Sequence, residues 1–257
     1  MPNVIAWDSE TARFRPALIA PPLVCLTWQK QGEAAQIAHV STAQRHLVEW
    51  LASDDVLVGH NVAYDSAVVA ARFPTVRSLL FKAYDEERVT DTMIRQWLLD
   101  NAGGVLRGYV GNKGQFHEYK YSLEALAKRH ASIVLAKDGW RLSYGDFEAV
   151  PLSGWPERAR QVQEAAKPQV AELERQIAVY TALKDEAQVK ALTKERDGLV
   201  EMIASDPSRA SEYPLDDARA TLAVYLAQEK HATYLANQFF QTRAYFALQL
   251  SSVWGLR

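Results

Sequence analysis

Residues 3–10 read NVIAWDSE and run from apolar side chains directly into two carboxylates. The first half of this segment predicts a short apolar strand that leads into Asp8. We expect the carboxylates of Asp8 and Glu10 to converge at the point where this strand ends. An Asp-x-Glu pair occurs by chance in most proteins, so its meaning depends on the segments that follow it.

The segments after this strand alternate between strand-like and helix-like patterns. Further strands are predicted over residues 17–28, 35–40, 55–59 and 88–92. Helices are predicted after a cap at Ser41 or Thr42, over residues 64–73, over residues 92–99, from Ser122, and over residues 215–240. Strands that alternate with helices predict an α/β domain with a mixed central sheet flanked by helices.

Residues 155–212 differ in character, because between Pro156 and Ile203 the only glycine is Gly198. Their apolar residues recur at alternating spacings of three and four, as in the seam of a coiled coil. The seam positions are Val170, Leu173, Ile177, Tyr180, Val189, Leu192, Leu199 and Ile203. This region therefore predicts a protruding helical hairpin that breaks near residues 181–187 and ends at Asp206.

The composition limits the class of protein. A hydrophobic content of 48% in 257 residues is ordinary for a soluble globular chain, and the longest apolar runs fall short of the roughly 18 residues that a membrane span needs. A single cysteine, Cys25, excludes an internal disulfide and fits a reducing cytosol. The net charge of −2 disfavours electrostatic coating of nucleic acid, but not a nuclease, because bound cations invert the charge of an acidic pocket. We expect a cytoplasmic protein without a membrane partner.

Two further motifs place polar side chains at the starts of predicted helices. The first reads GHNVAYD, and its Asn61 and Asp65 share one helical face if the helix begins there. The second reads YPLDD, with the same four-residue spacing between Tyr213 and Asp217. That spacing favours Asp217 over its neighbour Asp216 as a ligand.

Carboxylates in three separate motifs suit the hydrolysis of a phosphodiester. The reaction needs an activated water and a stabilised leaving oxyanion, and two metal ions about 3.5–4 Å apart provide both. Mg²⁺ and Mn²⁺ prefer carboxylate and water oxygens, so no cysteine or histidine ligand is required. A tyrosine hydroxyl near the attacking water can orient it or help to remove its proton.

In this order, the three motifs resemble those of the DEDD exonuclease superfamily, tyrosine subclass. The motifs are Asp8-x-Glu10, Asn61-x3-Asp65 and Tyr213-x3-Asp217. The resemblance is to the proofreading domain of family A DNA polymerases, as in bacterial DNA polymerase I and its phage relatives. It implies an RNase H-like exonuclease fold, two divalent cations (Mg²⁺ or Mn²⁺), and 3′-5′ removal of nucleotides from single-stranded or frayed DNA during replication. The implied partners are a single-stranded 3′ end and primer–template DNA.

The resemblance also implies a role for each matched residue. Asp8, Glu10 and Asp217 would hold the more tightly bound metal. Asp8 would bridge to a second metal, which Asp65 would contact through water, while Tyr213 would position the nucleophilic water. The residues that would contact the terminal nucleotides are Thr11, Phe14, His60, Asn61 and Tyr64, with Phe14 as an apolar wedge against the last base.

The resemblance divides the chain into three parts. Residues 1–155 and 213–240 form the expected exonuclease domain. Residues 156–212 stand where the family has only a short helix, so the helical hairpin is expected to be an insertion whose purpose the family does not imply. Residues 241–257 resemble the lead-in to the polymerase domain of phage enzymes. They suggest a covalently linked polymerase domain, and a phage-encoded protein would act in the host cytoplasm.

Two other functions stay open. An RNA-processing exonuclease resembling RNase D would use the same motifs, although the WGLR tail favours the polymerase interpretation. An inactive exonuclease fold could serve as a docking module, but all four carboxylates are present, which argues against it. A histidine-type exonuclease is disfavoured, because Glu212 and Tyr213 stand where its histidine would be needed before Asp217.

Overall fold

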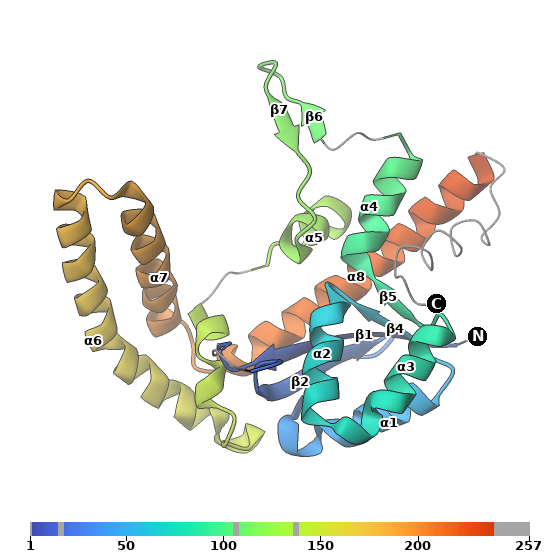
Figure 1. Cartoon of the computed structure of the whole chain (residues 1–257), viewed down its shortest axis with the longest axis horizontal. Helices are drawn as coiled ribbons and strands as arrows, with labels where there is room; N and C mark the ends of the chain where they lie inside the picture. The colour runs from blue at the N-terminus through green and yellow to red at the C-terminus, as the bar shows by residue number, and fades with distance from the viewer. Residues whose placement is uncertain (1, 15–17, 105–107, 136–138, 239–257) are drawn as a thin grey trace.

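A computed structural model of the chain describes residues 2–14, 18–104, 108–135 and 139–238 (Figure 1). Five strands form one mixed sheet in the order β3-β2-β1-β4-β5. The central strand β1 pairs antiparallel with β2 and parallel with β4. The strands are β1 Val4–Thr11, β2 Leu23–Lys30, β3 Gln36–His39, β4 Val56–Gly59 and β5 Val89–Asp91. The α/β class and the mixed sheet predicted from the sequence are confirmed.

Eight α-helices surround the sheet or extend from it in the described part of the chain. They are α1 Val40–Ala52, α2 Val62–Arg72, α3 Arg77–Asp85, α4 Thr92–Ala102, α5 Leu123–Ala131, α6 Trp155–Ala182, α7 Glu186–Ala204 and α8 Arg209–Gln238. Short 3₁₀ turns are η1 Pro74–Val76, η2 Gly139–Leu142, η3 Tyr144–Asp146 and η4 Leu152–Gly154. No helix among the described residues is both long enough and apolar enough to cross a membrane.

The strand β1 continues beyond the point that the sequence predicted for its end. It runs through Thr11, so Asp8 and Glu10 both lie within it. Side chains two residues apart on a strand point to the same face of the sheet. The convergence of the two carboxylates therefore comes from regular alternation, and the prediction that it depends on the end of the strand is wrong.

The alternation of β1 also separates two parts of the core. Ile5 and Trp7 pack in the large apolar cluster that includes residues of α1, α2 and α3. Ala6, between them, packs instead with Leu222 and Tyr225 of α8. The even-numbered positions of β1 thus face α8, and the two carboxylates share that face.

Two helix starts differ from the sequence prediction. The cap of α1 is His39, whose ring accepts a hydrogen bond from the backbone N–H of Ser41, so Ser41 and Thr42 are not the caps. Helix α8 begins at Arg209 and contains Pro214, which cannot donate to the carbonyl of Ala210 one turn earlier. The hydroxyl of Tyr144 donates to that carbonyl at 3.0 Å, which lets the helix continue through the proline.

A short two-stranded ribbon lies between α4 and α5. Its strands, β6 Gly108–Val110 and β7 Phe116–Glu118, pair antiparallel. The rings of Tyr109 and His117 stack across the pair with centroids 5.2 Å apart. Cross-strand ring pairs of this kind stabilise a ribbon that the glycines alone would not specify.

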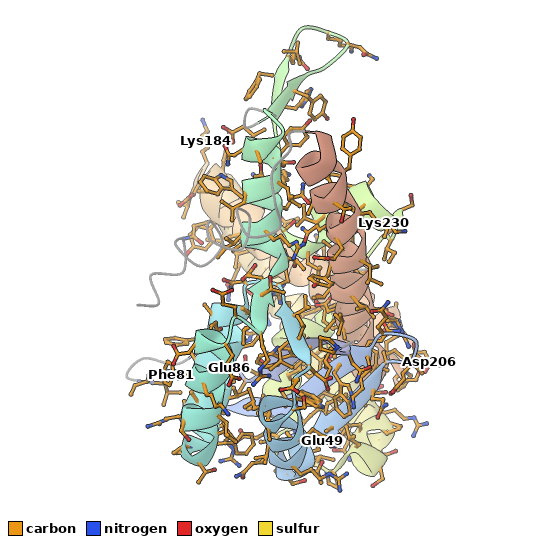
Figure 2. All side chains as sticks on the ribbon, turned by 90° about the vertical axis from the view of Figure 1, so that its right-hand side faces the viewer. Glu49, Phe81, Glu86, Lys184, Asp206 and Lys230 are labelled. Carbon is orange, nitrogen blue, oxygen red and sulfur yellow. The ribbon has the colours of Figure 1, made fainter. Side chains whose placement is uncertain are left out.

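The predicted helical hairpin is present as α6 and α7, and the predicted break falls at residues 183–185. All eight seam residues predicted from the spacing are at least half-buried. The base of the hairpin joins a cluster of buried residues that includes Val162 of α6, Met202 of α7 and Cys25 of β2. Figure 1 shows α7 on the inner side of the hairpin, toward the sheet, and α6 on the outer side. In Figure 2, Lys184 marks the tip and Asp206 the base.

One close backbone contact fixes α7 against η2. A Cβ atom placed on Gly139 would lie 2.1 Å from the carbonyl oxygen of Gly198. No side chain fits at position 139 unless α7 moves, whereas a Cβ on Gly198 would meet its nearest neighbour at 3.8 Å. The hairpin is therefore seated on the rest of the fold through the bare backbone of Gly139.

Candidate active site

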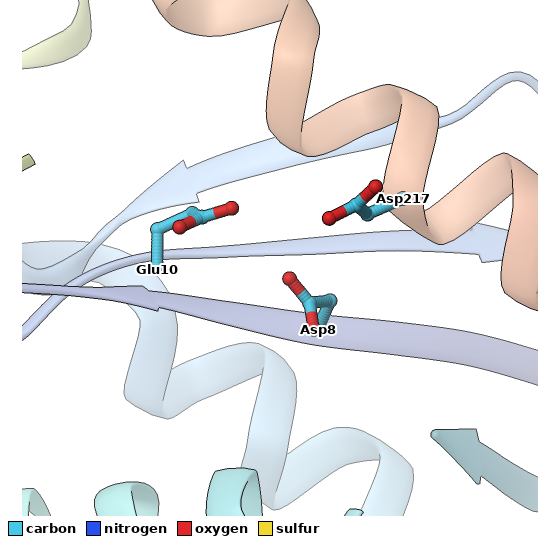
Figure 3. A group of neighbouring side chains, drawn as sticks. All are labelled: Asp8, Glu10 and Asp217. Carbon is cyan, nitrogen blue, oxygen red and sulfur yellow. The ribbon is translucent and has the colours of Figure 1, made fainter. Parts of the chain in front are cut away.

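Three carboxylates from two elements point into one space (Figure 3). Asp8 and Glu10 extend from β1, and Asp217 extends from α8. One oxygen atom from each of the three lies within 4.8 Å of the others. Asp217 belongs to the helix that covers the even-numbered face of β1, so sheet pleat and helix packing together bring the three groups to one point.

The charges of this group repel one another, and burial makes the repulsion costly. Burial raises the pKa of Asp8 well above its usual range, and the Asp65 carboxylate raises it further. Burial, then Asp8 and Asp217, raise the pKa of Glu10 in the same way. The guanidinium of Arg141 opposes both pKa shifts. A divalent cation would relieve the same repulsion more strongly than a proton can.

Asp65, the fourth predicted carboxylate, lies near this group but outside it. Its Oδ1 accepts a hydrogen bond from the backbone N–H of Ser9 at 3.0 Å and another from the hydroxyl of Ser9. Ser9 is an odd-numbered residue of β1 and faces α2, which carries Asp65. Burial raises the pKa of Asp65 to about 7, although the bonds from Ser9 act to lower it. The structure therefore brings together three of the four predicted carboxylates.

Tyr213 lies one helical turn before Asp217 in α8 and is buried. Burial raises the pKa of its hydroxyl above the usual value, and the charges of Asp217 and Glu10 raise it further. Its ring lies 6.4 Å from that of Tyr144, centroid to centroid. The hydroxyl is thus held in its neutral form beside the three carboxylates.

Asp216 points away from the group that contains Asp217. Its two carboxylate oxygens pair with Arg209 at 3.2 Å and with Arg219 at 2.7 Å. Both arginines belong to α8. Asp216 therefore takes part in a surface ion-pair network of its own helix.

The residues predicted to contact nucleotides lie in two segments, at or just after the end of β1 and at the start of α2. Thr11 Oγ1 and the Tyr64 hydroxyl are hydrogen-bonded at 2.8 Å, which joins the end of β1 to α2. Phe14 is 64% exposed and lines a separate groove beside α6. Asn61 is exposed at the start of α2 in a left-handed conformation, with φ 61°. Its neighbour His60 is half-buried instead, with Nδ1 2.9 Å from the Thr92 hydroxyl.

Asp91 ties the first turns of two helices together. Its Oδ1 accepts from the N–H groups of Met93 and Ile94 at the start of α4. Its Oδ2 accepts from the N–H of Val62 at the start of α2, at 2.8 Å. Asp91 therefore holds the helix that carries Asp65, a role that reaches beyond capping its own helix.

Sequence reasoning missed Arg141, which is the cation beside the carboxylates. It lies in η2 and shares a cavity wall with Tyr213. The carboxylates of Glu10, Asp217 and Asp8 help to raise its pKa above the usual value against the effect of burial. No motif signals this residue, because its position depends on the contact between η2 and α7.

The donor set fits a hard divalent cation. All three groups are carboxylates, and Mg²⁺ and Mn²⁺ favour oxygen ligands of this kind. A family model described as 3′-5′ exonuclease matches residues 1–152 of the chain. No curated protein matches the chain.

Proposed function

Because the chain belongs to the 3′-5′ exonuclease family of family A DNA polymerases, we propose that it removes nucleotides from the 3′ end of single-stranded or frayed DNA. The observation that carries the proposal is the group formed by Asp8, Glu10 and Asp217, with one oxygen of each within 4.8 Å of the others. This group lies beside a neutral tyrosine hydroxyl. A 3′-5′ exonuclease needs this combination of a cation site and a group that positions water.

In the proposed reaction, Asp8, Glu10 and Asp217 would hold one divalent cation, and Asp8 with Asp65 would support a second. Such cations lower the pKa of water and stabilise the negative charge on the leaving oxygen. Asp65 remains anchored by Ser9, so its other oxygen stays available. The raised carboxylate pKa values mean that the residues release protons when a cation binds.

Tyr213 positions the attacking water rather than removing its proton. A hydroxyl whose pKa is raised above the usual tyrosine value stays protonated at neutral pH. It can then donate one hydrogen bond and accept another, which fixes the orientation of a water molecule. The burial of Tyr213 at the edge of the site keeps this hydroxyl in one place.

The remaining residues hold the substrate in this proposal. Thr11 and Tyr64, joined by their hydrogen bond, contact the sugar of the last nucleotide. The exposed Phe14 wedges against the base of the last nucleotide. Asn61 and His60, at the start of α2, border the DNA strand. We assign the activity to proofreading within a family A DNA polymerase. The segment that resembles a polymerase lead-in, residues 241–257, lies outside the described residues.

The test is degradation of a 5′-labelled single-stranded DNA with Mg²⁺ or Mn²⁺. Wild type is compared with the double variant Asp8→Ala/Glu10→Ala, and a matched RNA serves as a second substrate. The proposal predicts a ladder that shortens from the 3′ end only with wild type and only with added metal, and faster on DNA than on RNA. Equal or faster cleavage of RNA would favour an RNA-processing role, and cleavage by the double variant would overturn the proposal.

A further inference from the structure

A large cavity runs along α7, and its wall includes Tyr213 and Arg141 of the candidate active site. Its volume is about 1130 Å³. At one end its wall includes Arg141 and Tyr213, and at the other it reaches Thr181 and Lys184 at the tip of the hairpin. We call this cavity the hairpin groove. Helix α7, which forms its long side, is the inner helix in Figure 1.

The hairpin groove adjoins the carboxylate group through Tyr213 and Arg141, which line it. Tyr213 precedes Asp217 by one turn, and Arg141 interacts electrostatically with all three carboxylates. The wall of η2 and that of α7 meet at the Gly139–Gly198 contact, which fixes the groove relative to the site. A polymer whose end occupies the site therefore has a formed path along α7.

Three lysines line the groove without a charge partner. Lys184, Lys190 and Lys194 are exposed, and none of them makes an ion pair with another described residue. Lys190 and Lys194 are four residues apart, so they lie on one face of α7 about 6 Å apart along its axis.

Acidic residues in the groove are partly engaged elsewhere. Asp185 accepts from the N–H of Gln188 as the cap of α7, and Asp197 binds the guanidinium of Arg196. Glu186 and Glu201 also line the groove. Neither Glu186 nor Glu201 makes an ion pair with another described residue, so the groove carries unpaired groups of both signs, and its three ammonium groups can bind an anion.

The outer helix shows the opposite pattern. On α6, Arg160, Lys167 and Arg175 each pair with a glutamate three residues earlier. Pairing along the helix is the ordinary arrangement for solvent-exposed charges. The unpaired cations of the hairpin are thus concentrated on the side that faces the site.

We propose that the hairpin groove holds the single DNA strand directly 5′ of the nucleotide being removed, with Lys190 and Lys194 contacting its phosphates. The inference rests on the proposed function for the identity of the polymer. Phosphates attract ammonium groups without regard to base sequence, which suits an enzyme that must accept any 3′ end. In this proposal the function of the inserted hairpin is to bind the DNA strand.

The test uses the full chain with Lys190→Glu/Lys194→Glu. The matched control is Lys167→Glu/Arg175→Glu, which changes the charge equally on the outer helix. Each is assayed on a single-stranded oligonucleotide of about 20 nucleotides and on the p-nitrophenyl ester of thymidine 5′-monophosphate, which is too short to reach α7. We expect the groove variant to lose about tenfold in kcat/KM on the oligonucleotide at low salt. Its hydrolysis of the ester stays at the wild-type rate, and the control keeps both activities.

A binding measurement separates this inference from the proposed function. Fluorescence anisotropy of the labelled oligonucleotide needs no catalysis, so it decides the role of the groove even if wild type hydrolyses neither substrate. Each lost phosphate contact lowers the slope of log K against log salt by about 0.7 for single strands, so the groove variant should lose about 1.4. Equal binding by the groove variant and the control would overturn the inference. An equal loss on both substrates would do the same, because the lysines would then act on the site and not on the strand.

Discussion

The carboxylate site and the hairpin groove lie side by side, but they are built in different ways. In the site, Asp8 and Glu10 are fixed by the pleat of a buried strand, and Asp217 is fixed by a helix packed on that strand. In the groove, Lys190 and Lys194 stand exposed on a helix that is held at its base by the shared core cluster and by the Gly139 contact. Catalytic residues on rigid, buried elements have a regular spacing, so they can be recognised in the sequence as a motif. A binding surface made of exposed lysines resembles any solvated helix face until the fold shows what it faces.

The largest expected effect separates the two neighbouring aspartates of α8. Asp217→Asn should lower kcat/KM by more than about a hundredfold, the upper end for residues that merely support a metal ligand. Asp216→Asn weakens only half-buried ion pairs with Arg209 and Arg219, away from the carboxylate group, so it should stay near wild type. Single-turnover degradation of single-stranded DNA measures both. Equal activity of the two variants would mean that the site does not include Asp217.

Removing the hydroxyl of Tyr213 tests whether it positions the attacking water or stabilises the folded protein. Tyr213→Phe should lower kcat by about ten- to a hundredfold, below the range of a full general base, with little change in Tm. Tyr144→Phe is the matched variant, because it leaves the Ala210 carbonyl without its donor. It should cost about 1–3 kcal/mol of unfolding free energy. Thermal melts and rate measurements are made on both variants. A Tyr213→Phe variant that lost stability but kept its rate would contradict the role of Tyr213 in positioning the water.

The pH dependence of metal binding tests the raised pKa values of the site. Asp65 has a pKa of about 7, and burial raises those of Asp8 and Glu10, so cations must displace protons below neutral pH. Mn²⁺ affinity should therefore fall about tenfold per pH unit for each proton displaced as pH drops from 7 to 6. Isothermal titration in two buffers of different ionisation enthalpy would also detect the released protons. An affinity independent of pH would show that the carboxylates are already ionised in the free protein.

The smallest expected effect concerns the seat of the hairpin. Gly139→Ala forces its Cβ against the Gly198 carbonyl, so α7 must shift, and degradation of long DNA should fall several-fold while the short ester is spared. Gly198→Ala has room for its methyl group and lies inside a helix, so it should raise stability by up to about 0.5–1 kcal/mol. Thermal melts and the two substrates report the contrast. A shared loss on both substrates in Gly139→Ala would place the effect in the active site itself.

Much of the site could be predicted from the sequence, because its spacing reflects regular geometry. The four-residue step from Tyr213 to Asp217 placed both beside the carboxylates of β1. The convergence of Asp8 and Glu10 was expected for the wrong reason, since the strand continues through both. The hydrogen bonds from Ser9 to Asp65 could not be foreseen, because they depend on how α2 packs against the odd-numbered face of β1.

Positions set by long-range contacts were beyond the reach of the sequence. The early start of α8 depends on the Tyr144 hydroxyl, which lies 66 residues before its carbonyl partner. Arg141 lies in the η2 turn, whose Gly139 touches the backbone of α7, a contact that the sequence does not signal. The seam of the hairpin was predicted by its spacing, but the side on which its lysines face was not. Deletion of the hairpin would remove Met202 and expose its core neighbours Cys25 and Trp140, so point substitutions disturb the fold less.

The most direct test of the central claim is anomalous scattering from a crystal of the protein soaked in Mn²⁺. We expect a strong anomalous peak enclosed by Asp8, Glu10 and Asp217, about 2 Å from an oxygen of each. The peak should vanish in Asp217→Asn and persist in Asp216→Asn. A well-ordered site without a peak, or a peak held by other residues, would contradict the assignment of these three carboxylates as the metal centre.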